Sequence, residues 1–199
     1  MVLPLILASA SDIRAQLLRQ AAVQIEVIPA RVDEDMIRAS MLAEAASPRD
    51  IADALAEMKA ARISDKYPGR LVMGCDQVLD FKGRVLAKPE TPKEALEQLV
   101  ELRGERHMLL SAVVIYEDSK PIWRHVGQVR LRMRQSSDAY LAGYVERNWD
   151  SIRSAVGAYK LEEEGVRLFH QIEGDYFNVL GLPLLEILAY LTLRGELEQ

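Results

Sequence analysis

The sequence contains only one cysteine, Cys75, among its 199 residues. A single thiol cannot form an intramolecular disulfide, so we expect a reducing compartment, the cytoplasm. Cys75 ends the apolar run that begins at Leu71, where a cysteine ordinarily serves as a small core residue. A disulfide-stabilised scaffold is therefore excluded, and catalysis by this thiol is disfavoured.

Long apolar runs and an excess of basic charge are also missing. The stretch Val2 to Ala8 carries no charged leader and is too short to span a bilayer, so we expect no membrane partner and no secretion signal. The net charge of -5 and the pI near 5.4 provide no overall basic face for a nucleic-acid polymer. A small anionic ligand remains compatible, because a cleft needs only a few local cations.

Metal-ligand spacing and the common nucleophile motifs are absent as well. His107, His125 and His170 are far apart, and no Gly-rich phosphate loop or nucleophile elbow is present. Zinc chemistry and covalent serine chemistry are therefore disfavoured. What is present is an ordinary globular composition, 49% hydrophobic and 28% charged, which at this length predicts a single domain over residues 1–199 with at most two joined lobes.

Predicted strands and helices alternate along the chain. Apolar runs predict strands at 3–8, 24–28 and 71–75, a short hairpin at 78–87, and two long strands at 107–116 and 121–133. Helical spacing and capping residues predict helices at 12–22, 48–66, 91–103, 137–147 and 183–193. This order indicates an α/β fold with a mixed central sheet and flanking helices, in which ligands gather at strand ends.

The segment Ser9-Ala10-Ser11-Asp12-Ile13-Arg14 joins a predicted buried strand to a helix start. Free amides at a helix N-terminus carry partial positive charge, serine hydroxyls can donate, and Arg14 can bind phosphate oxygens. Ordinary N-capping explains the same residue types. The segment is thus a candidate phosphate site, with a purely structural cap as the alternative.

Asp76 is expected where strand 71–75 passes into the hairpin, with Gln77 next and Lys88 beyond it. A carboxylate partly screened from solvent can bind a metal or take a proton from water, and Lys88 can neutralise a phosphate. Asp80 is a competing acid. The alternative is an aspartate that caps its own turn beside a solvated lysine.

Three other features remain open at this level. The acidic loop Asp33-Glu34-Asp35 either binds a divalent cation or is solvated. Lys59, on the long helix, is of a type usually found on the surface. Segment 169–183 is irregular, and its Gly, Asp and Asn residues predict turns with a structural role.

Taken in order, these motifs resemble the Maf family of nucleotide pyrophosphatases over nearly the whole chain. The matching blocks are Leu7-Ala8-Ser9-Ala10-Ser11-Asp12-Ile13-Arg14, Val32-Asp33-Glu34, Lys59-Ala60, Gly74-Cys75-Asp76-Gln77-Val78, Lys88-Pro89 and the run from Ile172 to Pro183. The resemblance implies a Maf/ITPase-like fold. It also implies that one site contains Ser9, Ser11, Arg14, Glu34, Lys59, Asp76 and Lys88.

The activity that the resemblance implies is hydrolysis of a nucleoside triphosphate to the monophosphate and pyrophosphate, which removes non-canonical nucleotides. Asp76 would accept a proton from water, and a divalent cation, Mg or Mn, would be held by Glu34 and Asp76. Arg14, Lys59 and Lys88 would supply the remaining positive field. The resemblance favours a homodimer.

Base selection in the family is similarly tied to positions that correspond here to Ile13, Gln77 and Glu162. The Asp76-Gln77 pair, with Lys160 and Glu162, resembles the branch that acts on 7-methyl-GTP, whereas the dTTP and UTP branch usually has Asp-Thr. A carboxylate at Glu162 could accept from the guanine edge and would favour the positive charge of a methylated base.

Two departures leave alternatives open. Ile13 replaces an aromatic residue or Arg, and Glu163-Glu164 replaces a Gly-rich pair, so dTTP, UTP or another pyrimidine triphosphate is the alternative substrate. A regulatory binding protein acting in septum formation is the alternative of a different class. The retained Asp76 and Lys88 speak against a purely structural role.

Overall fold

The computed structural model describes residues 3–198, within which seven strands form one mixed sheet in the order β2-β1-β3-β5-β6-β7, with β4 paired to β3. The strands are β1 Leu5–Leu7, β2 Ile25–Val27, β3 Val72–Phe81, β4 Arg84–Leu86, β5 Arg106–Glu117, β6 Lys120–Met133 and β7 Phe169–Glu173. β1 pairs in parallel with β2 and β3, and every other pairing is antiparallel. The predicted mixed α/β sheet is confirmed.

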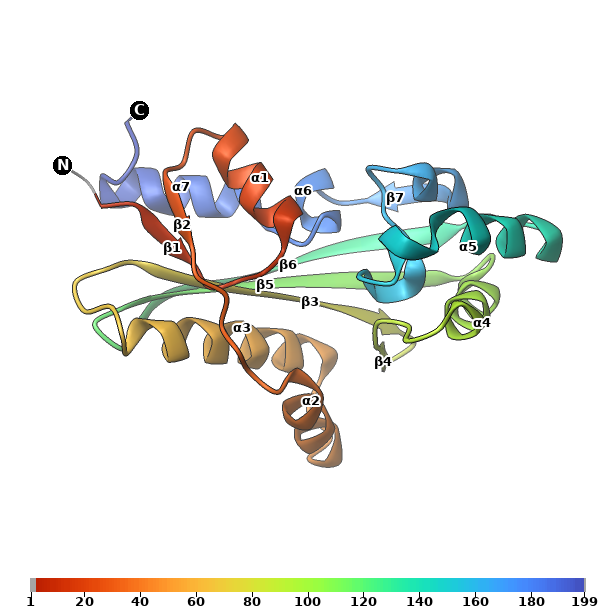
Figure 1. Ribbon diagram of the computed structural model, residues 1–199, viewed down its shortest axis with the longest axis horizontal. Helices are drawn as coiled ribbons and strands as arrows, with labels where there is room; N and C mark the ends of the chain where they lie inside the picture. Colours follow the sequence, from red (N-terminus) through yellow and green to blue (C-terminus); the bar gives the residue numbers. More distant parts are fainter. Residues whose placement is uncertain (1–2, 199) are drawn as a thin grey trace.

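Helices cover both faces of this sheet (Figure 1). They are α1 Asp12–Gln20, α2 Glu34–Ala43, α3 Pro48–Ser64, α4 Pro92–Leu102, α5 Asp138–Ile152, α6 Tyr176–Val179 and α7 Leu184–Arg194, with short 3-10 helices at Val156–Ala158 and Glu164–Leu168. Over residues 3–198, no helix combines the length and apolarity needed to cross a membrane.

The core consists of three apolar clusters, and β3 contributes to all of them. Even-numbered residues of β3, such as Val72 and Val78, pack against α3 on one face. On the other face Met73 and Cys75 pack with α1 and α7, and Leu79 packs with α4 and α5. This second face therefore carries two separate helical layers.

The prediction that a strand ends just before Asp76 was wrong, because β3 is one continuous strand of ten residues. β5 pairs with it over almost its whole length. On the opposite edge, β1 pairs only with the first two residues and β4 only with the last three. Asp76 thus lies in the middle of β3, beside the open edge between β1 and β4.

The acidic segment predicted as a loop is instead the start of α2. Asp33 caps this helix by accepting a hydrogen bond from the Met36 amide, and Glu34 is its first residue. No side chain of α2 is fully buried. Its apolar stripe is narrow, because only Ile37 and Met41 are partly buried against the cluster that contains α3. The segment predicted to be irregular also contains a strand, β7, which pairs with β6 although three of its five side chains are exposed.

Candidate active site

A cleft of about 400 Å³ opens beside the free edge of β3. It is lined by every site residue predicted from the sequence: Ser9, Ser11, Ile13, Arg14, Glu34, Lys59, Asp76, Gln77, Lys88 and Glu162. These residues come from the β1–α1 connection, α2, α3, β3, the segment after β4 and the segment after Val156–Ala158. The fold therefore brings together positions that are up to 153 residues apart.

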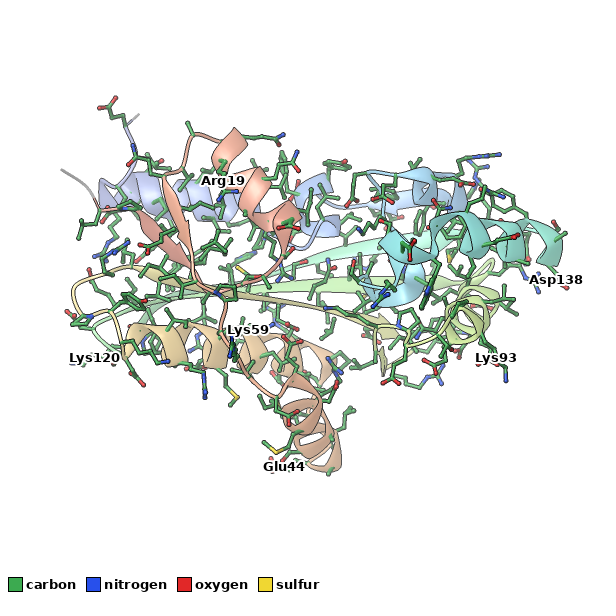
Figure 2. The ribbon with its side chains drawn as sticks, in the orientation of Figure 1. Arg19, Glu44, Lys59, Lys93, Lys120 and Asp138 are labelled. Atoms are coloured by element: carbon green, nitrogen blue, oxygen red, sulfur yellow. The ribbon has the colours of Figure 1, made fainter. Side chains whose placement is uncertain are left out.

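The close packing of α3 on β3 explains why Lys59 is in the site rather than on the surface. A Cβ atom added to Gly74 would lie 2.1 Å from the carbonyl oxygen of Ala56 and 2.6 Å from the amide nitrogen of Ala60. Only glycine permits this approach. Lys59, the residue before Ala60 on α3 (Figure 2), consequently has a side chain that is 8% exposed and reaches Asp76 on β3.

Lys59 bridges two carboxylates. Its Nζ lies 2.7 Å from Oε1 of Glu34 and 2.7 Å from Oδ1 of Asp76, so these oxygens are no more than twice that distance apart. Burial alone would raise the pKa of the Glu34 carboxyl, but the Lys59 ammonium, with Lys88 and Arg38 nearby, outweighs burial and holds this pKa below its usual value. Glu34 therefore carries its negative charge near neutral pH.

The N-terminus of α1 points its amides into the same cleft. Ser11 is the N-cap, yet among the described residues its side chain makes no capping hydrogen bond, so simple capping does not account for it. The first helical bond runs from the Ala15 amide to the Ser11 carbonyl, which leaves the three preceding amides outside the helical pattern. Ser9 differs, because its hydroxyl accepts from the Ser11 amide at 3.3 Å and from Arg14 at 3.3 Å.

Arg14 is held in a fixed orientation by two main-chain carbonyls. Its Nε donates to Gly181 at 2.8 Å and its Nη1 donates to Cys75 at 3.0 Å. Gly181 adopts a φ of +91°, which suits glycine. Nη2 has no hydrogen-bond partner within residues 3–198, so this corner of the guanidinium remains free to bind an anion.

Segment 169–183, which was predicted to have a structural role, forms one wall of the cleft through Val179 and Leu180. Gln77 fixes this segment to the sheet. Nε2 of Gln77 lies 3.0 Å from Oγ of Ser111, 2.9 Å from the carbonyl of Asn178 and 3.1 Å from that of Val179. Ser111 also donates to Asn178 at 2.7 Å. Gln77 thus lines the cleft, but its amide nitrogen is engaged with the protein.

The structure also decides between the alternative roles of Asp80 and Lys88. Asp80 accepts a hydrogen bond from the Gly83 amide at 2.7 Å and does not line the cleft, so the competing acid is a turn cap. Lys88 is exposed and lines the cleft. Arg38 also lines it and was not predicted, because its position one helical turn after Glu34 has meaning only once α2 is known.

Comparison with known proteins identifies the family of this chain. The Maf-like protein family matches residues 4–193. The chain belongs to the Maf family. A Ruegeria pomeroyi protein named nucleoside triphosphate pyrophosphatase is 67% identical over 100% of both chains, and a protein of the same name from Roseobacter denitrificans is 67% identical over 98% of each.

Among solved structures, a HAM1 protein from Coxiella burnetii aligns with a TM-score of 0.42 at 15% identity, covering 67% of this chain and 74% of its own. That likeness is too low to add to the assignment. Membership of the Maf family rests on the full-length sequence matches, which confirm the resemblance inferred from the order of the motifs.

At its other end the cleft of this Maf protein is less charged. Apolar side chains of Ile13, Leu109, Val156 and Leu161 line it there. The exposed carboxylate of Glu162 and the ammonium of Lys160, which pairs with Glu163, line it as well. This end is suited to a flat, partly apolar group, whereas the end that contains Lys59 is suited to phosphates.

The carboxylates of the cleft fit a divalent cation only when a phosphate chain supplies further oxygen ligands. Among residues 3–198 no group of three or more His, Cys, Asp or Glu side chains is arranged to hold a metal. Glu34 and Asp76 supply two carboxylates that both contact Lys59. A hard cation such as Mg²⁺ commonly takes one or two protein carboxylates and completes its shell with phosphate and water, so these two residues fit it when a phosphate chain is also present.

Proposed function

We propose that this Maf-family protein hydrolyses a nucleoside triphosphate, with 7-methyl-GTP as the preferred substrate, to the monophosphate and pyrophosphate. The observation that carries the proposal is the Glu34–Lys59–Asp76 array beside the N-terminus of α1 in one cleft. Full-length similarity to proteins named nucleoside triphosphate pyrophosphatase supports the same activity.

The phosphate chain binds at the charged end of the cleft. The free amides of the first turn of α1 and Nη2 of Arg14 lie on one side, and Lys59 and Lys88 come from other elements. Helix N-terminal amides and guanidinium groups both favour phosphate oxygens. Because Arg14 is already anchored by two carbonyls, little conformational entropy is lost when it binds phosphate.

Asp76 is the residue that removes a proton from the attacking water. Oδ1 is bonded to Lys59, and Oδ2 has no hydrogen-bond partner within the described residues. As the water oxygen bonds to the α-phosphorus, its proton passes to Asp76. The bond between the α-phosphorus and the oxygen that bridges it to the β-phosphorus breaks. Pyrophosphate leaves, and the cations around it stabilise the charge that develops on it.

A divalent cation, Mg or Mn, would be held by Glu34 and Asp76 together with the phosphates. When bound, it offsets the negative charge of the pyrophosphate group. Lys59 would keep both carboxylates oriented toward the cleft, since it contacts each of them at 2.7 Å.

The base lies at the less charged end. Ile13 and Leu161 offer apolar contacts, and Glu162 places a carboxylate where a methylated, positively charged guanine would be favoured over a neutral base. Gln77 contributes by fixing the Asn178–Val179 wall through its amide nitrogen. Selectivity on this account depends on Glu162 and on the shape of that wall.

Pyrophosphate release from 7-methyl-GTP, GTP, dTTP, UTP and CTP tests the proposal, with wild type and two matched variants. Glu162→Gln should reduce the preference for 7-methyl-GTP over GTP about fivefold, because an exposed charge pair contributes about 1 kcal/mol. Glu146→Gln is the control, since that carboxylate is exposed and does not line the cleft.

Preferential release from a pyrimidine triphosphate would correct the base assignment alone. Release from no triphosphate, with Mg or Mn present, would contradict the enzymatic proposal and favour a binding protein instead.

A further inference from the structure

A second hollow, of about 290 Å³, is lined by Ile28, Pro29, Arg31, Arg62, Ile63, Lys66 and Tyr67. Three of these seven residues are cations and none is acidic. We call this hollow the basic groove. It shares no lining residue with the cleft described above.

The basic groove and the cleft flank the segment that connects β2 to α2. Ala30 lines the cleft, whereas its neighbours Pro29 and Arg31 line the groove. On α3, Lys59 lines the cleft and Arg62, almost one turn later, lines the groove. Figure 1 shows the connecting segment crossing in front of α3 before it enters α2.

The cations of the groove are not engaged with protein carboxylates. Within residues 3–198, none of Arg31, Arg62 and Lys66 takes part in an ion pair, although the chain has a net charge of -5. The C-terminal end of α3 favours positive charge, which accounts for Arg62 and Lys66. It does not account for Arg31, which comes from a different segment and completes the cluster.

We propose that the basic groove is a second binding site, for the phosphate groups of a nucleotide whose base lies against Tyr67. Guanidinium groups bind phosphate oxygens in pairs, and a lysine adds a compact charge. Tyr67 offers an aromatic face, and Ile28 and Pro29 an apolar surface, of the kind that bases stack on. The groove shares no lining residue with the cleft and contains no carboxylate that could remove a proton from water, so it binds without reacting.

The test is calorimetric titration at constant ionic strength with two probes, pyrophosphate and an α,β-methylene analogue of GTP that cannot be hydrolysed. Wild type should bind each probe at two sites. The triple variant Arg31→Gln, Arg62→Gln, Lys66→Gln should keep one site and the wild-type kcat, with affinity at the second site reduced at least about tenfold.

A control variant with the same change of charge is Arg19→Gln, Lys120→Gln, Arg130→Gln, whose residues are exposed and line neither hollow. Figure 2 places Arg19 on α1 and Lys120 at the turn between β5 and β6. This variant should retain both sites. A single site in wild type, or equal binding by the two triple variants, would overturn the proposal.

Tyr67→Leu separates a nucleotide from a bare phosphate ligand. Leucine keeps apolar packing for this half-buried side chain but removes the aromatic face. The variant should bind the nucleotide analogue more weakly at the second site and pyrophosphate unchanged. Unchanged binding of both probes would overturn the assignment to a nucleotide. These binding curves do not depend on hydrolysis, so failure of the second-site proposal can be distinguished from failure of the proposed activity.

Discussion

Replacing Lys59 by methionine removes the single charge that joins Glu34 to Asp76 and keeps a straight apolar chain of similar length. The side chains of Lys59 and Asp76 are 8% and 7% exposed. Removing one partner of so buried a pair costs about 3–5 kcal/mol, because the other is left without its counter-charge. Glu34 is about one-third exposed, so solvent screening makes its share of this cost small.

The cost should depend on pH in a defined direction. The pKa of Glu34 is lowered below 4.5 in the folded protein, so its contribution to stability is present above about pH 4.5 and is lost as the pH falls through the folded value. In Lys59→Met, burial acts on this carboxyl without its strongest opposing charge, and its pKa rises. The difference in unfolding free energy between wild type and variant should therefore shrink as the pH falls toward about 4.

Urea unfolding of both proteins at neutral and at acid pH measures this. Lys93→Met is the control, since Lys93 extends from α4 into solvent (Figure 2) and its pair with Glu97 is 86% and 62% exposed, which predicts a cost of at most about 0.5 kcal/mol. If Lys59→Met cost no more than Lys93→Met, or if its cost grew in acid, the reasoning about the buried array would be refuted.

Three other perturbations follow from the core. Gly74→Ala should cost about 3 kcal/mol or more in urea unfolding, because its Cβ would lie 2.1 Å from the carbonyl oxygen of Ala56, whereas Gly69→Ala, with a φ of +72° and open space around it, should cost about 1 kcal/mol. Burial raises the pKa of Cys75 to about 11, so iodoacetamide should label this thiol at about pH 8 only after unfolding, and rapid native labelling would contradict its burial. Burial lowers the pKa of His107 from 6.5 to about 4, so the unfolded chain takes up a proton at higher pH than the folded protein does. Roughly 3 kcal/mol of stability should therefore be lost as the pH falls through that window. His107→Phe should flatten this dependence of the unfolding free energy on pH, and an unchanged dependence would disprove the assignment.

Much of the fold could be predicted because the signals were local. Ser47, Thr91 and Ser137 cap α3, α4 and α5 by accepting from amides three residues later, as capping patterns predict. The turn at Lys82-Gly83 has positive φ at both residues and forms the expected hairpin. Elements with buried apolar stripes were thus found from sequence.

The errors arose where the decisive contacts are not local. Asp76 looks like the end of a strand because a charge interrupts an apolar run, but β5 pairs across it and Lys59 on α3 satisfies the carboxylate. α2 was missed because none of its side chains is more than partly buried, and the place of Arg38 in the cleft was missed with it. Which residues form the site was given by family resemblance, whereas the engagement of Gln77 with the Asn178 wall could be seen only in the structure.

The measurement that tests the central claim most directly is the kcat for pyrophosphate release by Asp76→Asn and Asp80→Asn. Both aspartates are buried on the same face of β3, but Asp76 lines the cleft and Asp80 caps the Gly83 amide. Asp76→Asn should reduce kcat at least about 100-fold while the protein stays folded, and Asp80→Asn should lower stability but keep kcat within about threefold. Equal kcat values for Asp76→Asn and wild type would contradict the claim that this carboxylate removes the proton from water.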